Sequence, residues 1–251
     1  MSHGSTESMM SLMPHSLSII VPAWNEADYL PDTLSAVTAS AEQAGISVET
    51  IVVDNASTDA TRLIALDHGA RVVDEPERRI ARVRNTGARA AQAPGLLFVD
   101  ADTRVEAAHL RAARDALEGG WAGGGAMITF DRVDGALQRL GLAAWNTLSR
   151  RLHLAAGCFV FVRAELHAEL GGFSEKVYAG EEIDYSRRLR RLARQRGLRF
   201  DMLDTPPVVS SARKVDWFRP WQHALVLFTF VLFPWAGRFQ RLTWFWYRRP
   251  E

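Results

Sequence analysis

The stretch Gly95–Thr103, which reads GLLFVDADT, constrains the fold of this chain more than any other segment. Four consecutive apolar residues, 96–99, predict a strand that is buried on both faces, as strands of a parallel sheet are. Asp100 and Asp102 follow this strand. Because alternate side chains of an extended chain share a face, both carboxylates are expected to point into one crevice. That crevice lies at the carboxyl end of the strand, where open α/β sheets bind their ligands.

Two neighbouring carboxylates repel each other, and a hard divalent cation relieves the repulsion. Such a cation takes oxygen ligands and can also bridge phosphate groups. The D-x-D pair therefore indicates a cation and phosphate site. An ordinary structural role remains open, because Asp102 could instead cap the helix that follows the strand.

The first half of the chain repeats a strand–helix pattern. Strands are predicted at 17–21, 48–53 and 71–73, and helices at about 26–44, from Ser57 or Thr58 as a cap to Leu66, and at 79–91. Strands and helices that alternate with short connections predict a mostly parallel sheet flanked by helices, as in nucleotide-binding α/β folds.

Polar residues follow three of these strands, and capping alone does not account for all of them. The segments are Pro22-Ala23-Trp24-Asn25-Glu26, Asp54-Asn55 and Asp100-Ala101-Asp102.

Here the sequence resembles family two of the nucleotide-sugar glycosyltransferases, which have the GT-A fold. Residues 21–26 are similar to the V-P-x-x-N-E motif of that family, and residues 53–59 to its V-D-D-G-S-T-D motif, with Asn55-Ala56 in place of Asp-Gly. Arg84-Asn85-Thr86-Gly87 matches R-N-x-G, and Asp100-Ala101-Asp102 matches D-x-D. The order and spacing agree over roughly residues 17–105.

The resemblance implies a role for each matching residue. Asp54 would accept a hydrogen bond from the nucleobase, and the Pro22–Glu26 turn would contact the nucleoside. Arg84 would lie beside the base or the phosphates, although a solvated helix face is its ordinary alternative. Asp100 would lie near the ribose and the metal, and Asp102 would bind Mg²⁺ or Mn²⁺. The donor-binding residues implied in this way are Pro22, Ala23, Asn25, Glu26, Asp54, Arg84, Asp100 and Ala101.

The second half is expected to hold the acceptor side. A glycine-rich break at 119–125 precedes a strand at 126–130, a helix at 135–153, a strand at 156–162 and a last short strand within 200–209. Cys158, the only cysteine, is interpreted as a small buried apolar residue. A lone cysteine excludes an intramolecular disulfide and favours a reducing compartment.

An acidic cluster follows Gly171-Gly172-Phe173, in the segment Gly180-Glu181-Glu182-Ile183-Asp184. Acids at a helix start can simply favour the helix dipole. The pattern, however, resembles the family's acceptor-side signature, in which Glu182 takes the place of the catalytic base. Displacement at an anomeric carbon requires a carboxylate to take the proton of the acceptor hydroxyl. Glu182 is ranked first, then Glu181 and Asp184. Arg213, in a Ser-Ala-Arg run, is a candidate phosphate contact.

Charge and apolar residues are unevenly distributed. Residues 1–120 carry 10 arginines and 17 acidic residues, a formal charge of −7, whereas residues 121–251 carry 20 basic and 12 acidic residues, +8. A basic half suits phosphates or an anionic membrane surface and gives no sign of a nucleic-acid partner. Residues 1–16 are expected to form a disordered leader.

Residues 216–251 are expected to form an apolar helical tail, whose uncharged span of 18 residues is borderline short for crossing a bilayer. Packing on the domain, attachment to a membrane interface and a true span all remain open. The arrangement predicted is a GT-A domain over 17–215, with a nucleotide-sugar half at 17–118 and an acceptor half at 119–215.

The function predicted is metal-dependent transfer of a sugar from a nucleotide-sugar to an acceptor hydroxyl, with inversion. A lipid-linked acceptor, a place at the cytoplasmic face of the membrane and a role in the bacterial cell envelope follow from the tail and the resemblance. Alternatives are a retaining GT-A enzyme, a sugar-nucleotide nucleotidyltransferase and a non-catalytic binding module. The nucleotidyltransferase is disfavoured because the first strand leads into Pro22–Glu26 and not into a glycine-rich phosphate loop.

Overall fold

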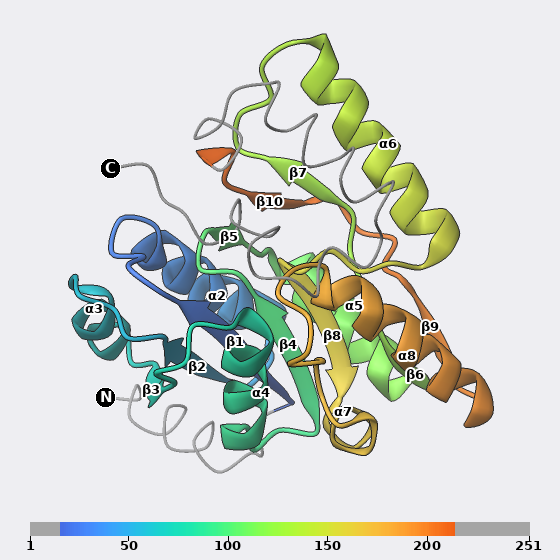
Figure 1. Ribbon diagram of the computed structural model, residues 1–251, viewed down its shortest axis with the longest axis horizontal. Helices are drawn as coiled ribbons and strands as arrows, with labels where there is room; N and C mark the ends of the chain where they lie inside the picture. Colours follow the sequence, from blue (N-terminus) through green and yellow to red (C-terminus); the bar gives the residue numbers. More distant parts are fainter. Residues whose placement is uncertain (1–15, 214–251) are drawn as a thin grey trace, which may run out of the picture.

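A seven-stranded mixed sheet forms the centre of the computed structural model, which describes residues 16–213 (Figure 1). The strand order is β3-β2-β1-β4-β8-β6-β9, and only β8 runs antiparallel to its neighbours. The strands are β1 (Leu17–Ala23), β2 (Val48–Asp54), β3 (Arg71–Asp74), β4 (Gly95–Val99), β6 (Trp121–Gly125), β8 (Phe159–Arg163) and β9 (Arg199–Met202). The predicted α/β class with a mostly parallel sheet is confirmed.

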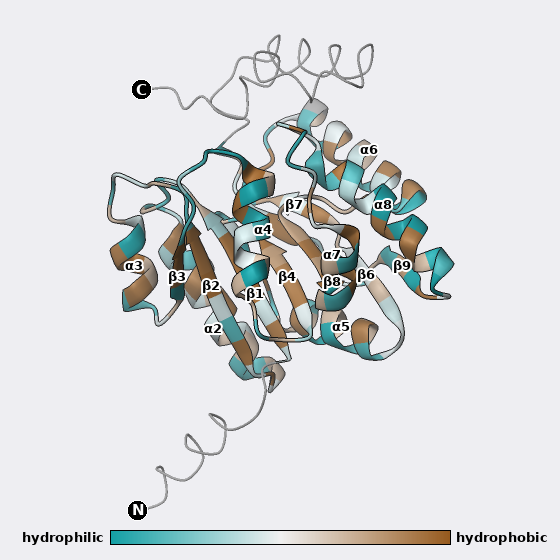
Figure 2. Ribbon diagram, turned by 60° about the horizontal axis from the view of Figure 1, so that its bottom comes forward, coloured by the Kyte–Doolittle hydropathy of each residue, from teal (hydrophilic) through white to brown (hydrophobic). Residues whose placement is uncertain are grey.

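Helices cover both faces of this sheet, and Figure 2 shows its apolar strands between them. Helices α2 (Leu30–Ala44), α3 (Thr61–Asp67) and α5 (Ala107–Glu118) pack on one face, and α4 (Ile80–Ala90), α7 (Ala164–Leu170) and α8 (Glu181–Gln195) on the other. Strand β4 contributes Leu97 and Val99 to the first core and Leu96 and Phe98 to the second. The expectation that this strand is buried on both faces is therefore confirmed.

A small second sheet lies beside the first (Figure 1). It has the order β5-β10-β7, from β5 (Thr103–Arg104), β10 (Val208–Ser210) and β7 (Ile128–Phe130). Because β5 directly follows the D-x-D motif and pairs with β10, this sheet brings the end of the described chain next to Asp102. Helix α6 (Ala136–Leu152) packs near β7 and exposes Leu140 and Leu148 to solvent.

The glycine-rich segment 119–125 was predicted to be a break between elements, and this prediction is wrong because the segment contains strand β6. Sequence propensity argues against a strand here, because glycine offers no side chain to pack. The structure shows the reason for the glycines: a Cβ atom on Gly124 would collide with the carbonyl oxygen of Asp201 in β9, and one on Gly123 with the backbone of β8. Close approach of three strands therefore excludes larger residues.

Several predicted boundaries are also corrected. Helix α2 begins at Leu30 and not near residue 26, and α3 begins at Thr61 after Ala60, so neither Ser57 nor Thr58 caps it. The strands predicted at 126–130 and 156–162 start later, at Ile128 and Phe159. The strand predicted within 200–209 is two strands, and α7 was not predicted.

Both ends of the chain fall outside the described residues. The predicted leader, apart from Ser16, and the predicted tail at 216–251 are not described. Within residues 16–213, no helix is both long enough and apolar enough to cross a membrane.

Candidate functional site

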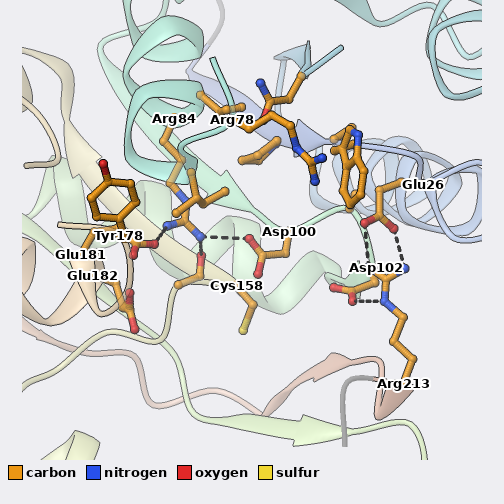
Figure 3. A pocket seen from close by; sticks show the side chains of 18 residues that line it. Glu26, Arg78, Arg84, Asp100, Asp102, Cys158, Tyr178, Glu181, Glu182 and Arg213 are labelled. Carbon is orange, nitrogen blue, oxygen red and sulfur yellow. Dashed lines mark hydrogen bonds and ion pairs between the residues drawn. The ribbon is translucent and has the colours of Figure 1, made fainter. Parts of the chain in front are cut away.

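A cavity of about 280 Å³ lies at the carboxyl ends of β1, β2 and β4. The amino end of the antiparallel β8 and the start of α8 complete its wall. Its lining residues are Pro22, Ala23, Trp24, Glu26, Asn55, Arg78, Ile80, Val83, Arg84, Asp100, Ala101, Asp102, Gly157, Cys158, Tyr178, Glu181, Glu182 and Arg213 (Figure 3). The crevice predicted at the strand ends is therefore present.

Asp100 and Asp102 both line this cavity, but they reach it from a turn, whereas extended backbone was expected. The turn follows β4, and the amide of Thr103 donates to the carbonyl of Asp100 at 3.1 Å. Asp102 does not cap α5, whose N-cap is Glu106, so the alternative capping role is wrong.

The loops after β1 and β2 are held together by hydrogen bonds between their polar residues. The amide of Asn25 donates to Oγ of Ser57 at 3.0 Å, and the amide of Thr58 donates to Oδ1 of Asn25 at 2.7 Å. Asp59 accepts from the amides of Ala27 and Thr61. These residues shape the rim of the site, and Asn25 does not line the cavity.

Asp54 lies at the end of β2 and is buried, but its neighbour Asn55 lines the cavity in its place. Its carboxylate accepts from the amide of Ser57 at 3.1 Å and lies 3.9 Å from Nη1 of Arg62. Ala56, where the family's motif has glycine, has φ +58°. The left-handed conformation explains why glycine suits this turn.

Arg84 is the buried centre of one side of the site (Figure 3). It extends from α4, is 2% exposed, and donates to Glu181 at 2.5 Å, to Asp100 at 3.0 Å and to the carbonyl of Gly157 at 3.0 Å. Burial disfavours its charge, but the carboxylates of Asp100, Glu181 and Glu182 outweigh burial and raise the pKa of Arg84. The guanidinium therefore stays charged and links the D-x-D motif to α8.

The remaining residues of the R-N-x-G motif hold α4 in place. Asn85 accepts from the amide of Phe173 at 2.8 Å and donates to its carbonyl at 3.0 Å. Gly172 has φ +70°, and a Cβ there would collide with the Asn85 side chain. Gly87 packs against β1 and β2, where a Cβ would meet Ile20 and Val53. The G-G-F motif thus docks onto the helix that carries Arg84.

An aromatic cluster fixes the position of α8. The Tyr185 ring stacks on Phe173 with centroids 4.1 Å apart, and Phe173 meets Phe98 edge-on at 5.0 Å. The Tyr185 hydroxyl lies 2.8 Å from Nδ1 of His167. Burial lowers the pKa of His167 to about 4, so its ring is neutral and can accept a hydrogen bond from the tyrosine hydroxyl.

Glu182 and Asp184 lie in contrasting surroundings. Glu182 faces the cavity, and its burial together with the charge of Glu181 raises the pKa of Glu182 to about 8, while Arg84 acts in the opposite direction. Asp184 does not line the cavity and accepts a hydrogen bond from Arg188 at 2.7 Å. Of the three acids ranked as candidate bases, the first two are therefore at the site.

Arg213 forms a second ion-pair centre across the cavity from Arg84 (Figure 3). Its Nη1 lies 2.6 Å from Glu26, its Nε lies 2.9 Å from Asp102, and its guanidinium stacks over the ring of Tyr29. Burial opposes its charge, but the hydrogen bond to Glu26 and the charge of Asp102 raise the pKa of Arg213.

The donor atoms of the site suit a hard divalent cation, but they are few. Asp100 and Asp102 bring carboxylates to one cavity, whereas the described residues contain no group of three or more acidic, histidine or cysteine side chains placed to bind a metal ion. Two carboxylates fit an ion such as Mg²⁺ that keeps waters and takes further ligands from a substrate's phosphates.

Six residues that line the cavity lie outside the predicted motifs: Arg78, Ile80, Val83, Gly157, Cys158 and Tyr178. Arg78 lies over the ring of Trp24, 3.4 Å from its centroid, and Tyr178 lies opposite, beside Arg79. Gly157 and Cys158 reach the cavity because β8 is antiparallel and begins at this edge of the sheet. Cys158 is buried, as predicted. The cationic run 78–89 was the available signal for Arg78.

A family model described as glycosyl transferase family 2 matches residues 18–170. The chain belongs to glycosyl transferase family 2. The match includes the strand ends of the cavity and Arg84 but stops before α8. The family membership predicted from the sequence motifs is therefore confirmed.

Two curated relatives of this family 2 chain are informative. It is 25% identical over 193 residues to glycosyltransferase AglE of Haloferax volcanii, covering 72% of this chain and 62% of the relative. It is 38% identical over 77 residues to the undecaprenyl-phosphate 4-deoxy-4-formamido-L-arabinose transferase of Pseudomonas fluorescens, covering 31% and 22%. The chain thus spans less than two thirds of the length of either relative.

The fold is shared with a solved glycosyltransferase. The mannosyltransferase PcManGT of Pyrobaculum calidifontis, in complex with GDP-mannose and Mn²⁺, superposes with a TM-score of 0.65 at 21% identity, over 86% of this chain and 61% of that one. The likeness supports the GT-A-like arrangement of sheet and helices.

Proposed function

We propose that this family 2 glycosyltransferase moves a sugar from a nucleoside-diphosphate sugar to an acceptor hydroxyl with inversion at the anomeric carbon, assisted by Mg²⁺ or Mn²⁺. The observation that carries the proposal is the arrangement of the cavity. Its D-x-D carboxylates and the Glu181–Glu182 pair lie in one hollow and are linked through a single buried arginine, Arg84.

The donor occupies the side of the cavity formed by the carboxyl ends of β1, β2 and β4. The Pro22–Glu26 turn, Asn55 and the Trp24–Arg78 stack offer an aromatic ring, an amide and a cation to a nucleoside. Asp54 remains the predicted base contact, and Asn55 is a second candidate because it lines the cavity. Asp102 and Asp100 would hold the cation, which when bound stabilises the charge of the departing diphosphate.

The acceptor side supplies the base. Glu182 faces the cavity and, once ionised, can take the proton of an acceptor hydroxyl as the oxygen attacks. Glu181 is bound to Arg84, so its carboxylate is held in place and is less suited to move a proton. Arg84 keeps Asp100 and the start of α8 at a fixed separation.

A lipid-linked acceptor at the cytoplasmic face of a membrane completes the proposal. The relative from Pseudomonas fluorescens is named for undecaprenyl-phosphate, and residues 216–251 of this chain are rich in tryptophan, apolar residues and arginine. Flotation of the full chain with anionic liposomes tests this part. If the full chain does not float with the liposomes, this part of the proposal is contradicted.

A thermal-shift panel of nucleoside diphosphates, each with Mn²⁺, Mg²⁺ or neither, tests the donor and the metal together. A ligand that binds the folded chain raises its melting temperature, so one base with one cation is expected to stand out. Asp102→Ala should abolish the cation-dependent shift. Asp115→Ala, an exposed aspartate on α5, is the matched control and should retain it.

A panel with no selective rise would contradict the proposed donor. A rise that is equal with and without cation, and equal in Asp102→Ala, would remove the metal from the proposal and leave the nucleotide.

A further inference from the structure

The guanidinium of Arg213 binds the carboxylate expected to bind the cation. Its Nε lies 2.9 Å from Oδ2 of Asp102, while Nη1 and Nη2 lie 2.6 and 2.8 Å from the two oxygens of Glu26. The side chains of Arg213, Glu26 and Asp102 are 9%, 9% and 4% exposed. Figure 3 shows Arg213 reaching up between these two acids.

Buried carboxylates need a positive partner, because leaving one unpaired is strongly unfavourable. Arginine satisfies this need with a rigid planar set of N–H donors. A divalent cation satisfies it by direct contact with the oxygens at little more than 2 Å. Oδ2 of Asp102 is already in contact with Arg213, and Oδ1 lies 3.5 Å from Oγ of Ser210. A cation that binds this carboxylate would therefore compete with the guanidinium.

Arg84 and Arg213 are placed differently in the fold. Arg84 lies within α4 and donates to the backbone carbonyl of Gly157 as well as to carboxylates. Arg213 follows the short strand β10, and its guanidinium contacts the side chains of Glu26, Asp102 and Tyr29. A change of the Arg213 rotamer would move the guanidinium away from Asp102.

The backbone beside Arg213 is anchored at the site. The amide of Ser211 donates to the carbonyl of Asp102 at 3.1 Å, and the amide of Ala212 donates to Asp131 at 2.9 Å. A side chain that leaves Asp102 thus stays tethered next to the cavity, within reach of an anionic group bound there.

We propose that Arg213 is an internal counter-ion that competes with the divalent cation for Asp102, so that cation binding releases the guanidinium toward the diphosphate of the donor. This inference rests on the proposed function for the identity of the cation and the donor. It assigns to Arg213 an exchange between two anionic partners, in place of a fixed phosphate contact.

Binding of Mn²⁺ alone to the full chain, measured by electron paramagnetic resonance, tests the competition. Arg213→Met removes the charge and keeps much of the side-chain volume, so it should bind Mn²⁺ at least tenfold more tightly than the wild type. Arg213→Lys should lie between the two, because it keeps the charge without the planar fork.

Arg104→Met is the matched control for the loss of one nearby positive charge. Arg104 lines the neighbouring cavity together with Asp102 but pairs with Asp32 on the surface. Its removal should change Mn²⁺ affinity by less than about threefold, since exposed charges are screened. An equal gain in both variants would reduce the effect to general electrostatics and overturn the proposal.

The second half of the exchange is tested with uridine and guanosine diphosphates at saturating Mn²⁺. Arg213→Met should bind the preferred diphosphate about tenfold more weakly, although it binds Mn²⁺ more tightly. Folding is checked by melting: Mn²⁺ without nucleotide should raise the melting temperature of Arg213→Met more than that of the wild type, because the cation replaces the missing counter-ion.

The outcomes separate this inference from the proposed function. Cation-dependent diphosphate binding by the wild type, with no gain of Mn²⁺ affinity in Arg213→Met, overturns the inference alone. Tighter Mn²⁺ binding by Arg213→Met, with no diphosphate bound by any variant, supports the competition and overturns the proposed donor. No Mn²⁺ binding by any variant overturns both the inference and the metal-dependent part of the function.

Discussion

Five carboxylates and three arginines line the cavity, and the carboxylates differ in whether an arginine neutralises their charge. Arg84 neutralises Asp100 and Glu181, and Arg213 neutralises Glu26 and Asp102. Among the described residues, Glu182 forms no ion pair of its own. It is therefore the carboxylate whose pKa moves into the range in which a group can exchange protons near neutral pH.

The raised pKa of Glu182 predicts a pH-dependent turnover. A base must be ionised, so kcat should rise with pH around a midpoint near 8. Glu182→Gln should lower kcat by about 10²–10⁴-fold, the usual contribution of a general base, with donor affinity nearly unchanged. Steady-state kinetics from pH 6 to 10 measures both effects.

Asp184→Asn is the matched control, because Asp184 pairs with Arg188 away from the cavity. A second readout is stability. The folded chain holds a proton on Glu182 between its ordinary pKa of 4.5 and about 8, so wild-type stability falls relative to Glu182→Gln as pH rises through this window. An inactive Asp184→Asn beside an active Glu182→Gln would transfer the role of base to Asp184.

Arg84 is expected to matter for folding as well as for the site. Arg84→Met leaves Asp100 and the buried Glu181 without their cation, and breaking a buried pair in this way costs about 3–5 kcal/mol. Arg89→Met, on the exposed side of the same helix, should change stability by less than about 0.5 kcal/mol. Urea unfolding measures both, and equal stabilities would contradict a structural role for the buried ion pairs.

Individual elements show why glycines occur at certain positions of this chain. Gly87 lets α4 approach β1 and β2 closely, and Gly172 lets its loop approach Asn85. Both contacts fix the position of α4, the helix that carries Arg84. The R-N-x-G and G-G-F motifs are thus parts of one packing arrangement, although they are far apart in the sequence.

Two helical glycines provide an internal comparison. Gly87→Ala should destabilise the fold by about 1–3 kcal/mol, because the new methyl group meets Ile20 and lies 2.9 Å from Val53. Gly141→Ala, on α6 where nothing lies within 4 Å, should stabilise it by about 0.5–1 kcal/mol through helix propensity. Thermal melts measure both, and changes of the same sign would contradict the packing argument.

The sequence was sufficient for the elements that follow local rules. Strands β1, β2 and β4 are apolar runs ending in polar turns, and their carboxyl ends share one edge of the sheet because the strands are parallel. Ten of the thirteen candidate site residues line the cavity; the exceptions are Asn25, Asp54 and Asp184. The implied roles themselves remain predictions.

What could not be predicted depends on contacts between distant segments. No local sequence pattern indicates that the glycine-rich segment β6 is a strand. Its glycines are required by the close approach of the backbones of β8 and β9. The direction of β8 is likewise a property of the sheet, and it decides that Gly157 and Cys158 reach the site. The contact between Arg213 and Asp102 depends on the pairing of β5 with β10.

At the scale of the whole molecule, the two proposed halves of the chain share one sheet. Strand β4 of the first half pairs with β8 of the second, and one apolar core contains Leu96 and Phe98 together with Val160 and Tyr185. The halves proposed at 17–118 and 119–215 are therefore joined through a common core.

A fragment of residues 16–118 is accordingly expected not to fold alone. It keeps β1 to β4 but exposes the edge of β4 and the apolar residues that β8 and α8 cover. Circular dichroism should show no cooperative unfolding transition for it, whereas residues 16–213 should unfold cooperatively. A cooperative transition in the shorter fragment would show that the donor half is an independent folding unit.

The position of β8, between β4 and β6 and antiparallel to both, also determines which part of the molecule can open. Amide hydrogens of β1, β4 and β8 belong to strands with neighbours on both edges and are expected to exchange with deuterium only when the whole chain unfolds. The segment 174–180 has no such ladder and carries Tyr178 at the cavity wall. Its amides are expected to exchange before those of the three strands, so this part of the cavity wall should be more mobile than the strand ends beneath it.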